Sequence, residues 1–136
     1  MQKAYGLKTR TRLGIAEADA KVRELLAGEG FGILTEIDVA ATLHEKLGVT
    51  RDPYRILGAC NPHLAAEALD KEIDVGLLLP CNVIVYKDGG ETVVAALDPA
   101  TMVDLTDNPT LAWIAAEARS RMERVIDAIP KEDADA

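Results

Sequence analysis

Aromatic and basic residues are both scarce in this chain of 136 residues. Phe, Trp and Tyr make up only 4% of it, so the core must be built from Leu, Ile, Val and Ala, and few flat rings remain to stack on bases or sugars. The 15 Lys and Arg are outnumbered by 23 Asp and Glu, which gives a formal net charge of -8. Such a surface repels phosphate backbones and anionic lipid headgroups. We therefore expect neither a nucleic acid nor a membrane as a partner.

The sequence also lacks a long hydrophobic run. Its longest apolar stretch, residues 75–86, is interrupted by Gly76, Pro80 and Asn82 and is too short to cross a bilayer. Residues 1–12 carry four basic side chains without the apolar core of an export signal. We therefore expect a cytoplasmic protein. Its length and its apolar content of 49% predict a single domain over residues 1–130, followed by a frayed acidic tail at 131–136.

Cysteine and histidine are rare, with two of each. They form no cluster with the spacing of zinc ligands, and the chain has no phosphate-binding glycine loop, nucleophile elbow or HExxH motif. We therefore predict no metal and no cofactor. With no evident acid–base pair, the sequence favours a protein that is not an enzyme.

Hydrophobic periodicity and turn residues divide the chain into alternating elements. Strands are predicted over residues 2–8, 31–37, 54–60, 83–86 and 92–97, the last two joined as a hairpin by an Asp-Gly turn. Helices are predicted from Ile15 onward and after the capping residues Asp38, Asn61, Asp98 and Asn108. Residues 72–80 are interpreted as a loop that packs its leucines inward.

The order of these elements predicts a two-layer α+β sandwich with a mainly antiparallel sheet and helices packed on it. Both alternating faces of the predicted hairpin strands are apolar, whereas a sheet with one face in water should alternate with polar residues. Either helices or a second subunit must therefore cover the second face. A twofold homodimer is the commonest such arrangement.

The two cysteines are each followed by asparagine, in Ala59-Cys60-Asn61-Pro62 and in Pro80-Cys81-Asn82-Val83. The first thiol closes a predicted strand where a helix begins, and the second opens the next strand. If these strands run antiparallel, the chain reverses between the two motifs and the sulfurs face each other. This pair is the one constellation in the sequence with evident chemical potential.

Cys60 precedes a predicted helix start, whose free amide donors favour a thiolate. Cys60 is equally compatible with a plain packing role, because free cysteine is among the most buried residue types. Strand alternation places Tyr54 on the same face as Cys60 and Arg55 on the other, where Arg55 is a secondary candidate for contact with an anion. His63 is the imidazole nearest to Cys60, although a residue in the first turn of a helix more often faces solvent.

The acidic residues on the predicted helices, Asp19 among them, are interpreted as parts of solvated faces.

Three ordered segments carry a resemblance to a known family: residues 30–38, 53–62 and 76–83. Together they resemble the bacterial and archaeal domain-of-unknown-function family 302, over about residues 14–129. The resemblance implies a two-layer α+β fold similar to the topology of the TATA-binding protein, usually as a homodimer, and no established activity. The motif positions that it implies are Tyr54, Arg55, Cys60, Asn61, Pro62, Pro80, Cys81 and Asn82.

Three functional hypotheses follow, the third being a purely structural partner domain in which both thiols only fill the core. The first is a small homodimeric binding module without turnover, with a pocket for a small-molecule ligand near the two Cys-Asn motifs. The second is thiol chemistry, either redox sensing or sulfur carriage, with Cys60 as nucleophile and Cys81 as its resolving partner. The candidate site residues are Cys60, Cys81, Asn61, Asn82, Tyr54, Arg55 and His63.

Overall fold

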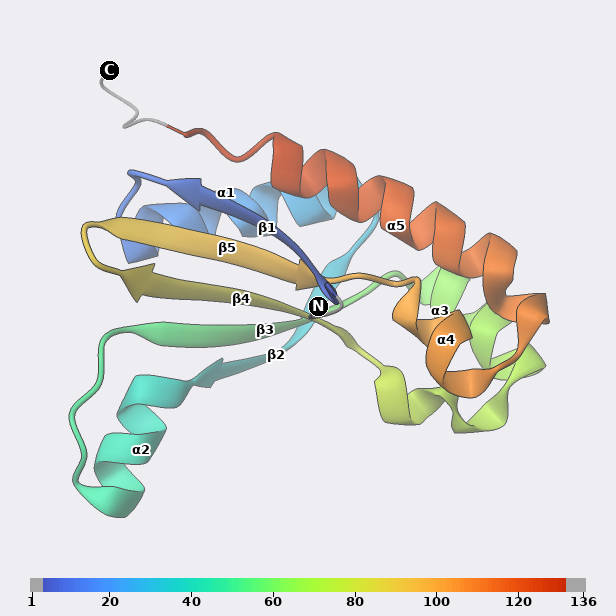
Figure 1. Ribbon diagram of the computed structural model, residues 1–136, viewed down its shortest axis with the longest axis horizontal. Coiled ribbons are helices and arrows are strands. Elements are labelled where there is room, and N and C mark those ends of the chain that lie inside the picture. The colour runs from blue at the N-terminus through green and yellow to red at the C-terminus, as the bar shows by residue number, and fades with distance from the viewer. Residues whose placement is uncertain (1–3, 132–136) are drawn as a thin grey trace.

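The computed structural model describes residues 4–131 of the chain, which form one sheet and a set of helices (Figure 1). The strands are β1 (Gly6–Thr11), β2 (Gly32–Asp38), β3 (Tyr54–Cys60), β4 (Cys81–Asp88) and β5 (Glu91–Leu97). The helices are α1 (Ile15–Gly28), α2 (Val39–Leu47), α3 (Pro62–Lys71), α4 (Thr101–Thr106) and α5 (Ala112–Asp127), with the short 3-10 helices η1 (Ile73–Leu78) and η2 (Pro109–Leu111).

All neighbouring strands of the sheet run antiparallel, in the order β1-β5-β4-β3-β2. The first strand thus lies beside the last one, with Gly6 paired to Leu97 and Thr11 paired to Thr92. This pairing extends β1 three residues beyond the predicted strand end at Lys8, while predicted strand residues 2 and 3 lie outside the described range. The predicted two-layer α+β class with an antiparallel sheet is confirmed.

Short-range turn and cap signals in the sequence are also confirmed. The β4–β5 hairpin turns at Gly89-Gly90, and Gly89 has a φ of 65° that suits glycine. Three predicted caps accept a backbone hydrogen bond from the turn that follows them: Asp38 from Ala41 N (2.9 Å), Asn61 from Leu64 N (3.2 Å) and Asn108 from Thr110 N (3.0 Å). Each cap satisfies a donor that has no partner inside its own helix.

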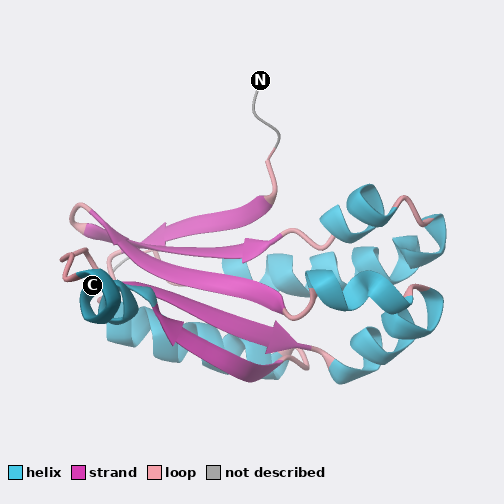
Figure 2. Cartoon of the chain, turned by 90° about the horizontal axis from the view of Figure 1, so that it is seen from below, coloured by secondary structure: helices cyan, strands magenta, loops and turns pink. Residues whose placement is uncertain are grey.

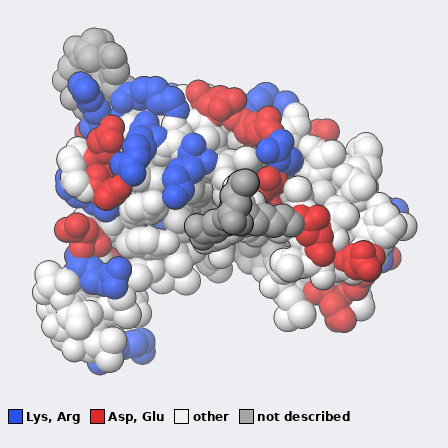
Figure 3. All heavy atoms as spheres, viewed as in Figure 1, with Lys and Arg blue, Asp and Glu red and all other residues white. Residues whose placement is uncertain are grey.

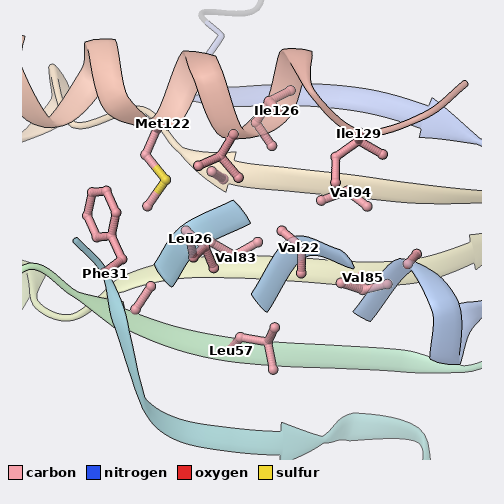
Figure 4. Packing of buried hydrophobic residues seen from close by; sticks show 14 of the residues in the cluster. Val22, Leu26, Phe31, Leu57, Val83, Val85, Val94, Met122, Ile126 and Ile129 are labelled. Carbon is pink, nitrogen blue, oxygen red and sulfur yellow. The ribbon is translucent and has the colours of Figure 1, made fainter. Parts of the chain in front are cut away.

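The central strands present two apolar faces, as the sequence indicates. Leu57 and Val83 are completely buried on the face that α1 and α5 cover (Figure 4). The neighbouring positions Ile56, Ile84 and Ala95 are paired across β3, β4 and β5 and point to the opposite side. We call this side the open face, because the long helices lie on the other side of the sheet (Figure 2).

A second cluster of buried residues joins α3, η1, α4 and the first half of α5 at one end of the sheet. The interpretation of residues 72–80 as a loop with inward leucines is wrong in part. Val75 is completely buried and Leu78 packs against the cluster, but Leu77 is 88% exposed. The reason is the 3-10 helix η1, whose three residues per turn bring positions 75 and 78 to one side and turn position 77 away.

The interpretation of Asp19 as part of a solvated helix face is also wrong. Asp19 is 6% exposed, and its carboxylate lies between α1 and β3. Arg23 Nε donates to Asp19 Oδ1 at 2.6 Å, and an Arg55 guanidinium nitrogen lies 3.3 Å from Oδ2. Arg23 also pairs with Glu36 at 3.0 Å, so this ion-pair network links α1 to β2 and β3.

Charge is unevenly distributed over the surface. Lys and Arg side chains gather over the β1 edge, and Asp and Glu gather over the end that carries η1 and α4 (Figure 3). The carbonyl of Lys131, the first residue of the predicted tail, accepts a hydrogen bond from Arg12 N at 3.2 Å, while residues 132–136 lie outside the described range. Within residues 4–131, no helix combines the length and apolar character needed to cross a membrane.

Candidate functional site

Both cysteines line one small cavity where β3 ends and β4 begins. Cys81 is the antiparallel partner of Ala59, and Cys60 follows Ala59 directly. The chain therefore reverses between the two Cys-Asn motifs, as expected for antiparallel strands. The cavity, which we call the thiol cavity, measures about 20 Å³. It is lined by Phe31, Ala59, Cys60, Asn61, Leu64, Ala65, Ala68, Leu79, Cys81, Met102, Ile114 and Ala118.

Local sequence signals fix both ends of this arrangement. Asn61 Oδ1 caps α3, Pro62 occupies the first helical position, and β3 therefore stops at Cys60. On the other side, a cis peptide between Leu79 and Pro80 leads directly into Cys81. Because β3 ends at Cys60, its side chain reaches the thiol cavity although regular alternation would place it opposite Ala59.

The two thiols differ in their access to solvent. Cys60 is partly exposed, whereas Cys81 is 7% exposed. Burial and, to a smaller extent, the neighbouring Cys60 raise the pKa of the Cys81 thiol to about 11. Burial has this effect because it disfavours the charged thiolate. At pH 8, roughly a thousandth of Cys81 is therefore thiolate.

Alkylation should separate the two thiols. With iodoacetamide between pH 7 and 9, we expect Cys60 to be modified first and Cys81 to remain largely unmodified while the chain is folded. The rate of Cys81 alkylation should rise as the pH approaches 11, since only the thiolate reacts. Peptide mapping by mass spectrometry over a time course measures both rates. Equal alkylation rates for Cys60 and Cys81 at pH 8 in the folded protein would contradict the burial of Cys81.

Met102 is a cavity residue that the sequence reasoning missed. It is buried on α4 and brings a thioether to the cavity that the two thiols share. No local signal marks it, because α4 reaches this site through packing with η1 and α5 rather than through strand pairing. Among residues 4–131, no group of three or more His, Cys, Asp and Glu side chains could hold a metal ion.

Asn82 lies on the other side of the sheet from the Cys81 side chain. It is exposed on the open face, opposite Gly58 in register, and it lines a larger hollow of about 580 Å³. We call this the open-face hollow. It lies over the ends of β1, β4 and β5 and is lined by Ala4, Tyr5, Gly6, Lys8, Asn82, Ile84, Ala95, Ala96 and Leu97.

The remaining predicted site residues lie apart from both cysteines. Tyr54 and Arg55 begin β3, whose last residue is Cys60. The Tyr54 ring stacks on Tyr86 with centroids 5.2 Å apart, and Arg55 points to the opposite side, toward Asp19. Tyr54 and Arg55 contribute to a separate hollow of about 390 Å³. His63 is exposed in the first turn of α3 and does not line the thiol cavity.

Comparison with known proteins agrees with the fold. The family model described as "Domain of unknown function DUF302" matches residues 7–129. The crystal structure of an uncharacterized conserved DUF302 protein from Bacillus stearothermophilus is similar to this chain, with 32% sequence identity and a TM-score of 0.87. The similarity covers 93% of this chain and 99% of that chain. No curated protein matches the chain. The chain therefore belongs to the DUF302 family.

Proposed function

We propose that this protein is a small homodimeric module that binds a small amphipathic anion in the open-face hollow, without turnover. The observation that carries the proposal is the hollow itself. Its volume of about 580 Å³ falls within the usual range of small-molecule sites, about 300–1,000 Å³. The thiol cavity, at about 20 Å³, has room for a single water-sized group and not for a metabolite.

The lining of the hollow indicates the chemistry of the ligand. Ile84, Ala95 and Leu97 form an apolar floor, which suits an aliphatic or aromatic body. Lys8 and Asn82 add an ammonium group and a carboxamide that have no hydrogen-bond or ion-pair partner within residues 4–131. An ammonium donor forms its strongest hydrogen bonds with a carboxylate or phosphate oxygen. A monocarboxylate with a short apolar chain fits this combination.

The surface charge supports the same ligand class. The chain is acidic as a whole, but the β1 edge beside the hollow carries Lys8 and Arg10 on the open face. Arg10 is already paired with Asp88 at 2.6 Å, which leaves Lys8 as the cation available to a ligand. The polar groups of the hollow are an ammonium, a carboxamide and the phenol of Tyr5. These groups recognise a ligand but supply no paired acid and base, so we propose binding alone.

Calorimetry with octanoate as the probe tests this proposal. We expect wild-type protein to bind octanoate at the open-face hollow and to bind octylamine more weakly. Lys8→Ala should lower the octanoate affinity about tenfold, since a hydrogen bond to a charged group contributes about 1.5 kcal/mol or more. Lys71→Ala, which removes an exposed cation at the end of α3 and outside the lining of the hollow, is the matched control. Absence of binding, or equal losses in both variants, would contradict the proposal.

The proposed second copy of the chain docks on the β2–α2 arm, which we define as residues 32–49. Helix α2 contains no buried residue, and four exposed large apolar side chains lie on the arm. These are Leu34, Ile37, Leu47 and Val49. The arm also presents β2, an edge strand of the sheet. Antiparallel pairing of one strand with its own copy is twofold symmetric, so it forms a closed dimer.

The dimer interface and the hollow do not compete for the same surface. The strand order places β2 and the arm at one edge of the sheet, and the hollow over β1, β5 and β4. Each subunit of the proposed dimer therefore keeps its own ligand site. The proposal places this module in the cytoplasm, where thiols such as Cys60 and Cys81 remain reduced.

Light scattering across a dilution series tests the dimer. We expect twice the mass of one chain for wild-type protein, and a monomer for the variant Leu34→Asp/Leu47→Asp, because each substitution places a charge at the apolar contact. Leu77→Asp is the matched control. It changes a more exposed leucine on η1 at the other end of the molecule and should leave the dimer intact. A wild-type monomer at every concentration would show that the arm has another role.

A further inference from the structure

We propose that Cys60 and Cys81 form an oxidative modification site, in which a hydroperoxide converts Cys60 to a sulfenic acid and Cys81 then closes a disulfide with it. This inference concerns the thiol cavity and does not depend on ligand binding in the open-face hollow. It rests on the geometry of the two thiols, on their unequal exposure and on the size of the cavity between them.

The unequal exposure assigns the order of reaction. Cys60 is partly exposed at the end of β3, so a small oxidant reaches it from solvent. Cys81 is buried on the first residue of β4, where an oxidant dissolved in water has little access. Oxidation therefore begins at Cys60, and Cys81 takes part through its position in the shared cavity.

The pairing of the strands brings the two residues within disulfide range. Ala59 is the direct partner of Cys81, and Cys60 is the next residue along β3. Strands about 4.8 Å apart, with a rise of about 3.3 Å per residue, put the Cα atoms of Cys60 and Cys81 about 6 Å apart. Disulfides span Cα separations of about 4.4–6.8 Å. This separation is within the range of a disulfide, and the Cys60 side chain at the strand end lines the same cavity as Cys81.

The cavity fits the intermediate. Its volume of about 20 Å³ admits one more small group, such as the oxygen of a sulfenic acid, between the two sulfurs. In the first step the hydroperoxide transfers one oxygen to Cys60 Sγ and leaves as an alcohol or water. In the second step the thiolate form of Cys81 bonds through Sγ to Cys60 Sγ, and the hydroxyl leaves as water with the proton that Cys81 has lost.

Mass spectrometry after treatment with hydrogen peroxide tests the proposal on the full-length, reduced protein. Wild-type protein should lose the mass of two hydrogen atoms, fail to take up iodoacetamide after denaturation, and yield one peptide pair that links residues 60 and 81. Cys60→Ser should lower the rate of thiol oxidation about tenfold or more, because only the buried thiol remains. A Cys60 sulfinic acid beside a free Cys81, or a bond between two chains, would overturn the proposal.

A second experiment removes Cys81, the resolving thiol. In Cys81→Ser and Cys81→Ala, Cys60 should stop at a sulfenic acid that dimedone traps, and no disulfide should form. Two substitutions are used because a hydroxyl at this buried position disturbs packing in a way that a methyl group does not. Thermal unfolding of each variant establishes that it is folded before oxidation. A folded Cys81→Ala variant that yields no trapped adduct would overturn the proposed order of reaction.

Discussion

Gly58→Ala is expected to lower the free energy of unfolding by about 2–3 kcal/mol, because the site has no room for a methyl group. A Cβ at this position would lie 2.2 Å from Thr35 Oγ1 and 2.8 Å from Pro80 Cγ. Gly58 lies in β3 between its neighbours β2 and β4, so the backbone cannot move away without disturbing both ladders. Urea denaturation followed by circular dichroism measures the loss.

A matched glycine and a double variant give this prediction its controls. Gly32→Ala, in β2, should change stability little, since nothing lies within 4 Å of the added methyl group. Thr35→Ala should be mild alone and should recover part of the stability when combined with Gly58→Ala, because it removes the nearer of the two clashing atoms. A Gly58→Ala variant as stable as wild-type protein would show that Thr35 and Pro80 leave room for a methyl group at position 58.

Asp19→Ala is expected to cost about 2–3 kcal/mol of stability. The change removes a buried carboxylate that pairs with Arg23 and Arg55, and loss of one member of such a pair costs about 3–5 kcal/mol when the remaining charge is fully buried. Here both arginine side chains are 32% exposed, so water compensates part of the loss. Asp19→Asn, which keeps the shape but not the charge, should cost less than Asp19→Ala.

Glu24→Ala on the same helix is the matched control for Asp19. Glu24 pairs with Lys21 at 3.5 Å, but its side chain is exposed, and such pairs contribute no more than about 1 kcal/mol. The difference in stability between Asp19→Ala and Glu24→Ala therefore measures the effect of burying the carboxylate rather than the number of ion pairs lost. If both variants lose the same small amount, the network between α1 and β3 contributes little to the fold.

The features that sequence predicted well are those specified within a few residues. The caps Asp38 and Asn61 and the glycine turn of the hairpin each act within one turn of the chain, so their signals need no knowledge of distant residues. The two apolar faces of the sheet follow from strand alternation. The reversal of the chain between the Cys-Asn motifs was also correct, because the helical insert ends beside the strand that it left.

The features that sequence missed depend on residues far apart in the chain. Asp19 is buried because α1 packs on the sheet face from which Arg55, 36 positions later, points toward it. Met102 reaches the thiol cavity through the packing of α4, and the open-face hollow exists because β1 lies beside β5. A short-range pattern carries no information on such contacts. Tyr54 and Arg55 are candidates through the motif of the family resemblance, although the predicted strand over residues 54–60 already separates them from Cys60 by its full length.

The most direct test of ligand binding on the open face is to map amide chemical shifts of isotope-labelled protein while octanoate is added. The largest shifts are expected at Gly6 and Lys8, at Asn82 and Ile84, and at Ala95 and Leu97, which meet in the open-face hollow. Residues around Cys60 and Met102 should change little. Shifts centred on the thiol cavity, or the absence of saturable shifts, would contradict the account.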